Sequence, residues 1–403
     1  MSNVLNRFLK YVNICTASDE SSDTFPSSSF QLAFGEALAD ECREIGMQDV
    51  SIDEYGYVSA FLPSNTELKA PSIAFIAHMD TSPDACGLNI RPVITENYDG
   101  GIIKLKGISL DPAEFPDLKN YIGDTIISSD GTTLLGADDK AGIAEIMTAM
   151  EYLIESGAEH GDICVLFTPD EEIGKGVDFL DVSKLKSDFG FTIDGGAIGE
   201  LEYENFNAAS AKVAIQGRNV HPGYAKDKMI NALQVAAEVN SLLPAWERPE
   251  HTDGYEGFYH LVGLNGSVEN AEISYIIRDH IRDKFEAKKQ FMMKVVELLT
   301  QKYGEGVLTL TLKDQYYNMR EMVEPHPEVI DKAFKAMEQA GVTPIVRPIR
   351  GGTDGARLSY MGLPCPNLFT GGMNFHGKFE YCSLDTMRRA QQTILNLIQL
   401  WAE

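Results

Sequence analysis

Imidazole and carboxylate side chains recur in this sequence where apolar runs of strand length end. The runs SIAFIAHMD, ICVLFTPDEE and FGFTIDGG each begin apolar and finish in acidic or histidine residues beside turn formers. In open α/β sheets, ligands bind outside the carboxyl ends of the strands. We therefore expect one rim of a sheet to gather these side chains, which are His78, Asp80, Asp138, Glu171, Glu172, Asp194 and His376.

Two imidazoles with several carboxylates suit zinc or a similar borderline divalent ion. Each signal also has an ordinary reading of its own. His78 alone is consistent with a hydrogen-bonded structural histidine, and the pair Glu171–Glu172 with a solvated loop. Asp138 and Asp139 are also suited to capping the helix that follows them. Their shared position at one end of several strands favours a metal site over these separate explanations.

The elements that must position these groups alternate between strands and helices. Between the first two runs, KAGIAEIMTAMEYLIESG has helical spacing and closes with Gly157. Such alternation predicts a largely parallel sheet covered by helices. After residue 318 the alternation of strands and helices resumes, with a helix at 327–341, a strand at 366–372 and a terminal helix from Asp385.

A different pattern occupies the middle of the chain. Predicted strands and helices follow one another there in the order β-α-β-β-α-β, which defines the ferredoxin-like unit. The strands are expected at 211–217, 260–267, 271–279 and 307–315, and the helices at 229–243 and 283–303. We therefore expect an α/β catalytic domain, formed by residues 1–208 and 318–403, with an inserted α+β domain at 209–317.

The charge balance and the cysteines indicate which classes of partner and which cellular compartment suit this chain. The chain carries 34 basic and 60 acidic residues, a net charge of −26, which repels nucleic acids and anionic membranes. Its six cysteines are scattered without a CxxC pair, as in reduced cytosolic proteins. The first residues lack the apolar run of a signal peptide, and no stretch approaches transmembrane length. A cytoplasmic location is expected.

Several motifs carry a family resemblance. HMDTSPD, GADDKAG, TPDEEIGKG, TIDGG, NVHPG and NFHGK resemble the dinuclear zinc metallopeptidase family that includes peptidase T, acetylornithine deacetylase and carboxypeptidase G2. Longer stretches, among them EGFYHLVGLNGSVENAEISYIIRD and RPIRGGTDGARLSYMGLPCPNLFTGG, resemble its peptidase T members in particular. The resemblance covers essentially the whole chain. It implies a zinc-peptidase-like catalytic domain, a homodimer, and removal of N-terminal residues from tripeptides.

The resemblance also implies a set of metal ligands for two zinc ions per subunit. Asp138 would bridge both ions. His78 and Asp194 would complete one position, and Glu172 and His376 the other. Such a pair of ions, about 3.5–4 Å apart, stabilises both the attacking oxygen and the charge that develops on a substrate carbonyl.

Three further residues receive catalytic roles from the resemblance. Glu171 would be the general base, and Asp80 would hydrogen-bond His78 and fix its tautomer. His221 would reach the active site of the partner subunit from the inserted domain. Without the resemblance, the sequence His221–Pro222–Gly223 is typical of a surface turn.

Small peptides are the expected substrates. The resemblance implies that Arg278 grips the C-terminal carboxylate of the peptide, which a guanidinium can do with two hydrogen bonds. Taken alone, Arg278 is consistent with a surface ion pair to Asp279 or Asp283. Asn231 and Arg350 are further candidates for positioning substrate.

Two alternatives remain open at this point. A deacylase or carboxypeptidase of the same family would share the metal ions and the general base but would bind its substrate with other residues. The peptidase T-like stretch around Arg278 argues against this alternative. A non-catalytic metal-dependent binding protein would lack the base, whereas Glu171 is present.

Overall fold

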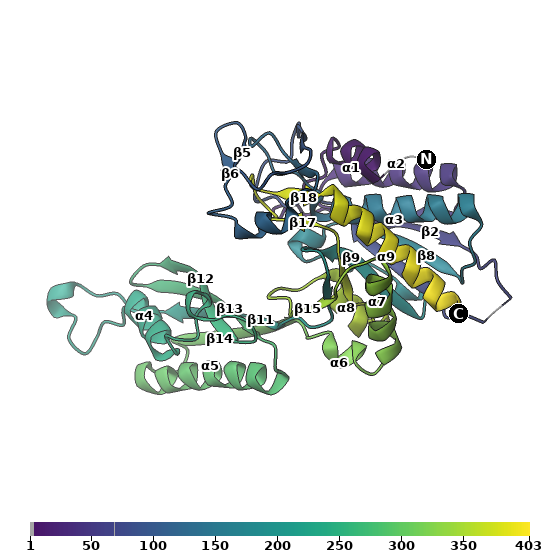
Figure 1. Cartoon of the computed structure of the whole chain (residues 1–403). Coiled ribbons are helices and arrows are strands. Elements are labelled where there is room, and N and C mark those ends of the chain that lie inside the picture. Colours follow the sequence, from purple (N-terminus) through teal and green to yellow (C-terminus); the bar gives the residue numbers. More distant parts are fainter. Residues whose placement is uncertain (1–3, 68) are drawn as a thin grey trace. The chain divides into compact units, whose positions relative to one another are not determined.

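The computed structural model describes residues 4–67 and 69–403, and these fold into two compact units (Figure 1). The first unit comprises the chain up to Tyr203 together with Met319–Arg347 and Thr353–Glu403. The second unit comprises Glu204–Asn318 and the short segment Pro348–Gly352. Residues 1–3 of the predicted catalytic domain lie outside the described residues.

An eight-stranded mixed sheet forms the centre of the first unit, in the order β1-β2-β8-β3-β9-β16-β10-β15. The neighbours β8, β3, β9 and β16 run parallel, whereas β1 and β2 add antiparallel strands at one side. The predicted, largely parallel sheet is confirmed, with antiparallel strands added toward its edges. The strands are Gln48–Ile52, Val58–Leu62, Ile163–Thr168, Ile73–His78, Phe189–Gly195, Asn367–Phe369, Glu200–Glu202 and Ile345–Val346.

Side chains of β3 pack on both faces of this sheet, which explains its uninterrupted apolar run. Ile73, Phe75 and Ala77 belong to the largest hydrophobic core of the unit. Ala74 and Ile76 face a second core. Strands covered on both faces have no need of polar residues at alternate positions.

Helices of the first unit cover the sheet. The helix α3 packs against α1 and α9, and α9 also packs against α7. A Cβ atom at Gly142 of α3 would lie 1.9 Å from the carbonyl oxygen of Ile193, so only glycine lets α3 approach β9 this closely. The helices are α1 (Val4–Val12), α2 (Ser29–Ile45), α3 (Ala137–Ser156), α6 (Arg320–Val323), α7 (Pro327–Gln339), α8 (Asp354–Tyr360) and α9 (Leu384–Ala402).

Short elements complete the first unit. A four-stranded sheet has the order β17-β18-β7-β4, and β5 pairs with β6. These strands are Gly372–Met373, Tyr381–Ser383, Ile126–Ser128, Val93–Thr95, Ile103–Lys104 and Ser109–Leu110. Three 3-10 helices lie at Pro116–Tyr121 (η1), Glu171–Ile173 (η2) and Val182–Leu185 (η3).

The second unit has the predicted ferredoxin-like order. Its antiparallel sheet, β12-β13-β11-β14, packs one face on α4 and α5. In β11 the residues Ala211, Val213 and Ile215 are buried and those between them are exposed, as expected for a sheet with one covered face. The elements are β11 (Asn207–Gln216), α4 (Ala232–Leu242), β12 (Phe258–Gly266), β13 (Asn270–Asp279), α5 (Arg282–Tyr303) and β14 (Leu308–Tyr316), with 3-10 turns at Pro222–Tyr224 (η4) and Pro249–His251 (η5).

Within the described part of the chain, no helix combines the length and the apolar character needed to cross a membrane.

Candidate active site

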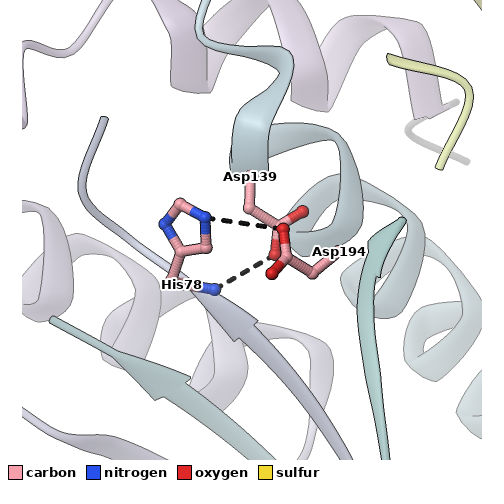
Figure 2. A group of neighbouring side chains, drawn as sticks. All are labelled: His78, Asp139 and Asp194. Atoms are coloured by element: carbon pink, nitrogen blue, oxygen red, sulfur yellow. Dashed lines mark hydrogen bonds and ion pairs between the residues drawn. The ribbon is translucent and has the colours of Figure 1, made fainter. Parts of the chain in front are cut away.

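The predicted ligand residues of the first unit meet at one rim of the central sheet. His78 is the last residue of β3, Asp194 lies near the end of β9, and Glu172 is in the turn after β8. Asp138 stands at the start of α3, and His376 lies between β17 and β18. Figure 2 shows His78 and Asp194 facing one another at this rim. The sheet topology thus brings together groups that are far apart in the sequence.

Asp138 lies between the two imidazoles. Its Oδ1 is 2.8 Å from Nε2 of His78, and its Oδ2 is 3.3 Å from Nε2 of His376. Nε2 of His78 is also 3.5 Å from Oδ1 of Asp194, and Nε2 of His376 is 2.8 Å from Oε2 of Glu172. One carboxylate therefore presents one oxygen to each of two clusters, each with one imidazole and one further carboxylate.

Asp80 holds both His78 and the turn that carries the two glutamates. Its carboxylate lies 3.3 Å from Nδ1 of His78, whose ring also contacts the carbonyl oxygen of Asp80 at 3.0 Å. The same carboxylate accepts the backbone N–H groups of Glu171 at 3.0 Å and Glu172 at 3.1 Å. With the Nδ1 proton of His78 donated to Asp80, the lone pair of Nε2 is directed at the cluster.

The turn itself is anchored from the other side by Asp170, which sequence reasoning missed. Its backbone adopts a positive φ of 53°. Its carboxylate accepts the amide of Gln31 at 2.7 Å, and its own N–H donates to Oε1 of Gln31 at 3.0 Å. Ser27 donates its backbone N–H to the same carboxylate at 2.6 Å. Glu171 and Glu172 therefore follow a residue that is fixed on the N-terminal part of the chain.

Asp139 differs in role from Asp138, although both lie beside His78, Asp139 buried and Asp138 half-buried. Its carboxylate accepts the backbone N–H of His78 at 3.1 Å (Figure 2). It also accepts the backbone N–H of Gly142 at 3.3 Å. The helix-capping alternative therefore describes Asp139, whereas Asp138 directs its carboxylate at the imidazoles. Asp139 also forms a compact group of possible ligand atoms with His78 and Asp194, within 4.8 Å of one another.

Burial dominates the electrostatics of the site. It raises the pKa of Glu171, and together with the charge of Asp138 it raises the pKa of Glu172 to about 8. Burial also raises the pKa of Asp194 to about 6. Burial opposes the charged form of His78, but the neighbouring carboxylates of Asp194 and Asp138 outweigh this and raise its pKa. Carboxylates buried this close together require nearby positive charge to stay ionised.

Metal ions fit this need. The donor set, two imidazoles and several carboxylates, is that of zinc and similar divalent ions. Possible ligand atoms of His78, Asp138 and Glu172 lie within 4.8 Å of one another. Among the described residues, none offers a hydrogen bond to the buried Oε1 of Glu172, so this oxygen is available to a cation.

His221 lies in the second unit, exposed at the tip of a turn. Its Nδ1 accepts the backbone N–H of Gly223 at 3.2 Å, and its ring lies 5.4 Å from that of Tyr224. A neutral imidazole that accepts at Nδ1 carries its proton at Nε2. The ring therefore presents an N–H donor to whatever approaches the turn.

Arg278 also lies in the second unit, on β13. Its Nη1 donates to the carbonyl oxygens of Ile277 at 3.0 Å and Ala209 at 3.3 Å, and the guanidinium lies over the ring of Tyr316 at 5.4 Å. Burial lowers its pKa. The surface ion pair considered from the sequence is wrong, because the guanidinium turns toward backbone carbonyl groups.

The side chains of Asn231 and Arg350 form hydrogen bonds to backbone groups of the second unit. Oδ1 of Asn231 caps α4 by accepting the N–H of Leu233 at 3.0 Å. Arg350 donates to the carbonyl oxygens of Gly254 at 2.7 Å and Glu256 at 3.1 Å. Each residue therefore stabilises a local element, in addition to any role in substrate binding.

Comparisons with solved structures assign the fold to a class. The chain is similar to aminopeptidase PepT from Bacillus cereus (TM-score 0.80, 22% identity, 100% of this chain and 98% of that one). It is also similar to a tripeptidase from Staphylococcus aureus (TM-score 0.81, 22% identity, 99% and 98%). A dinuclear metal-binding M20 peptidase from Bacillus subtilis follows (TM-score 0.66, 14% identity, 98% and 96%). The fold is that of the M20 metallopeptidases.

Relatives that match in sequence identify the family within this fold. The chain is 57% identical to the proteins named peptidase T from Caldanaerobacter subterraneus subsp. tengcongensis and from Clostridium novyi, over 100% of each chain. It is 54% identical to that of Geobacillus kaustophilus, over 99% of this chain and 98% of the relative. A family described as "Peptidase dimerisation domain" matches residues 203–307. This chain belongs to the peptidase T family, and the predicted resemblance is confirmed.

Proposed function

We propose that this chain is a dizinc aminopeptidase that removes the N-terminal residue from tripeptides. The observation that carries the proposal is the carboxylate of Asp138, which directs one oxygen at each of two imidazoles. Membership of the peptidase T family supports peptide hydrolysis, and the solved tripeptidase of the same fold supports the length of the substrate.

Five residues would hold the two metal ions. Asp138 would bind both ions, His78 and Asp194 would complete one position, and Glu172 and His376 the other. Bound zinc ions supply Lewis acidity, which polarises a peptide carbonyl and lowers the pKa of water.

Glu171 would act as the general base. Its N–H is held by Asp80, and burial raises the pKa of its carboxyl group, which favours taking up a proton near neutral pH. It would accept the proton of the attacking water and pass it to the amine that leaves.

His221 would serve the active site of a partner subunit. Its Nε2–H, fixed by the bond from Gly223 to Nδ1, would donate to the substrate carbonyl oxygen as negative charge develops there. His221 is exposed and directly precedes η4, and this position supports a contact with another subunit.

Arg278 would bind the C-terminal carboxylate of the peptide. Its two carbonyl contacts and the ring of Tyr316 hold the guanidinium in place, so little side-chain freedom is lost on binding. Asn231 and Arg350 would position substrate through the helix α4 and the segment around Gly254 that they hold.

A second copy of this chain is the proposed partner, and the inserted domain at 209–317 is the proposed site of pairing. The strand β12 is an edge strand of the second unit and exposes Leu261, Val262 and Leu264 by 37%, 54% and 47%. Exposed apolar edge strands favour pairing with another chain. The six unpaired cysteines support a reducing, cytoplasmic location.

The test is a panel of di- to pentapeptides with free and blocked ends, assayed after chelation and after addition of zinc. We expect chelation to abolish hydrolysis, zinc to restore it at two ions per chain, and tripeptides with a free N-terminus to be preferred. Activity in fully metal-free protein would contradict the proposal. Preference for blocked N-termini, or release of the C-terminal residue, would instead indicate a deacylase or a carboxypeptidase.

A further inference from the structure

A buried glutamate outside the predicted ligand set contacts the segment that leads into α3. Glu380 is 1% exposed and lies in the loop between β17 and β18, four residues after His376. Its Oε2 accepts the backbone N–H groups of Leu135 at 2.7 Å and Gly136 at 2.8 Å. Its Oε1 accepts those of Ala137 at 2.7 Å and Asp138 at 3.2 Å. One carboxylate thus binds four consecutive backbone N–H groups.

These N–H groups need an acceptor from elsewhere in the chain. The first N–H groups of a helix have no partners within that helix. Gly136, at the N-cap position of α3, has a positive φ of 76° and no side chain with which to cap. Hydrogen bonds from backbone N–H groups to an ionised carboxylate are stronger than those between neutral groups. Glu380 therefore fixes the backbone at the start of α3.

This contact joins two segments that carry proposed metal ligands. Asp138 is the last of the four residues bound by Glu380, and its carboxylate faces both imidazoles. His376 lies in the same loop as Glu380. Two hydrogen bonds close this loop. The side-chain amide of Asn374 donates to the carbonyl oxygen of Phe379 at 3.2 Å, and the backbone N–H of Glu380 donates to the carbonyl oxygen of Gly377 at 3.2 Å. A shift of Glu380 would move both ligands relative to each other.

We propose that Glu380 is a positioning residue for the dinuclear site, which clamps the segment of Asp138 to the loop of His376 so that both metal positions form together. This inference rests on the proposed metal-binding function. Glu380 is not itself a ligand, because both of its oxygens already accept two N–H groups. It also does not contact substrate directly, because it is buried.

The experiment compares Glu380→Gln with a matched control, Glu145→Gln. Glu145 is also a fully buried carboxyl group of the first unit and lies on α3, but it binds none of the four N–H groups. Metal-free proteins are titrated with Co²⁺, and both dissociation constants are measured from visible absorption and calorimetry. An amide presents only one accepting atom, so Glu380→Gln leaves some of the N–H groups without an acceptor.

We expect Glu380→Gln to weaken both Co²⁺ affinities by roughly 10–100-fold, the scale seen for residues that support ligands, and Glu145→Gln to bind as the wild type does. Glu380→Asp keeps the charge but is one methylene shorter, so it should also lose affinity. Wild-type affinity in Glu380→Gln, or an equal loss in both glutamine variants, would overturn the proposal. Full affinity in Glu380→Asp would show that charge alone matters and would overturn it too.

A second measurement does not depend on how the variants fold. In metal-free wild-type protein, the backbone N–H groups of residues 135–138 should exchange slowly with deuterium, because Glu380 binds all of them. Rapid exchange at these positions would contradict the clamp. A wild-type protein that takes up no Co²⁺ would contradict the proposed function and this inference together, whereas two bound ions with an unaffected Glu380→Gln would contradict this inference alone.

Discussion

Adjacent glutamates at the rim of the sheet have different surroundings, and these separate their proposed roles. Oε2 of Glu172 is 2.8 Å from Nε2 of His376, and its other oxygen is buried without a hydrogen-bond partner in the described part of the chain. For Glu171, no such imidazole contact is found among the described residues, and its N–H is fixed by Asp80. One side chain is therefore suited to a metal ion and its neighbour to a water molecule.

Substitution of the two glutamates should separate these roles. We expect Glu171→Gln to retain two metal ions per chain but to lose at least ~10²-fold in kcat, the usual scale for a general base. Glu172→Gln should lose metal from one position. Metal analysis of each purified variant, beside its kcat, checks this prediction. If the losses of metal and of turnover are exchanged between the variants, the two roles are reversed.

Arg278 gives a second prediction for a single residue. Arg278→Ala should raise KM for tripeptides with a free C-terminal carboxylate, because it removes a charge-assisted contact that contributes about 1.5–3 kcal/mol. C-terminally amidated tripeptides, which lack the carboxylate, should be affected far less. Steady-state kinetics on matched peptide pairs measures the difference. Equal effects on both kinds of peptide would show that Arg278 binds something else.

The helix α3 combines functional and structural demands within one element. Its first residues depart from helical geometry, with φ −83° and ψ 104° at Asp138, and this region faces the site. Further along, Gly142 allows close contact with β9. Glu145 is fully buried, and both of its oxygens lack hydrogen-bond partners within the described residues. Burial raises the pKa of Glu145, because a charged carboxylate would lose its hydration there.

The stability of the protein should therefore depend on pH through Glu145. In the unfolded chain this group ionises above pH 4.5, whereas the folded protein keeps it neutral to a higher pH. Its contribution to stability is fully present below pH 4.5 and is lost as the pH rises from there toward the folded pKa, by at most about 1.4 kcal/mol per pH unit. In Glu145→Gln this loss is removed, so its Tm relative to wild type should increase from pH 5 to pH 8.

Thermal unfolding of the metal-free proteins measures this difference. The control is Glu155→Gln, which makes the same change at an exposed position of the same helix. Its Tm should follow that of the wild type at every pH. A Tm difference between Glu145→Gln and wild type that does not change with pH would show that Glu145 titrates alike in the folded and unfolded chains.

At the scale of the whole molecule, the proposed chemistry is divided between two units. The metal ligands and Glu171 belong to the first unit, and His221 and Arg278 to the second. The second unit also carries the exposed edge strand β12 and most of the match to the peptidase dimerisation domain. A complete active site assembled from two chains would make dimerisation a requirement for activity.

Mixing two inactive variants tests this arrangement. Glu171→Ala and His221→Ala should each be inactive alone, whereas exchange of subunits creates mixed dimers with one intact site. Random exchange makes half of the dimers mixed, so about a quarter of wild-type activity should return in a symmetric dimer. Recovery is measured after exchange has been demonstrated with labelled subunits. Exchange without recovery would place His221 in the site of its own subunit.

The sequence by itself predicted the elements with strong local patterns. The continuous apolar runs of β3, β8 and β9 and the alternating strand β11 are confirmed because hydrophobic periodicity is a local property of the chain. The short strands β1 and β10 were not predicted, since β1 is mostly exposed and β10 has only three residues. The placement of His78 and Asp194 at strand ends followed from the same patterns.

Only the tertiary structure decided how these groups are held. Glu380 and Asp138 are 242 residues apart, and Gln31 and Asp170 are 139 apart, so no local pattern relates them. The distinction between Asp138 and Asp139 likewise depends on which carboxylate meets the backbone N–H of His78. Ligand types and strand ends are properties of short segments, and the sequence shows them. Hydrogen bonds between distant segments arise when the chain packs, so the supporting residues of the site became visible only in the folded protein.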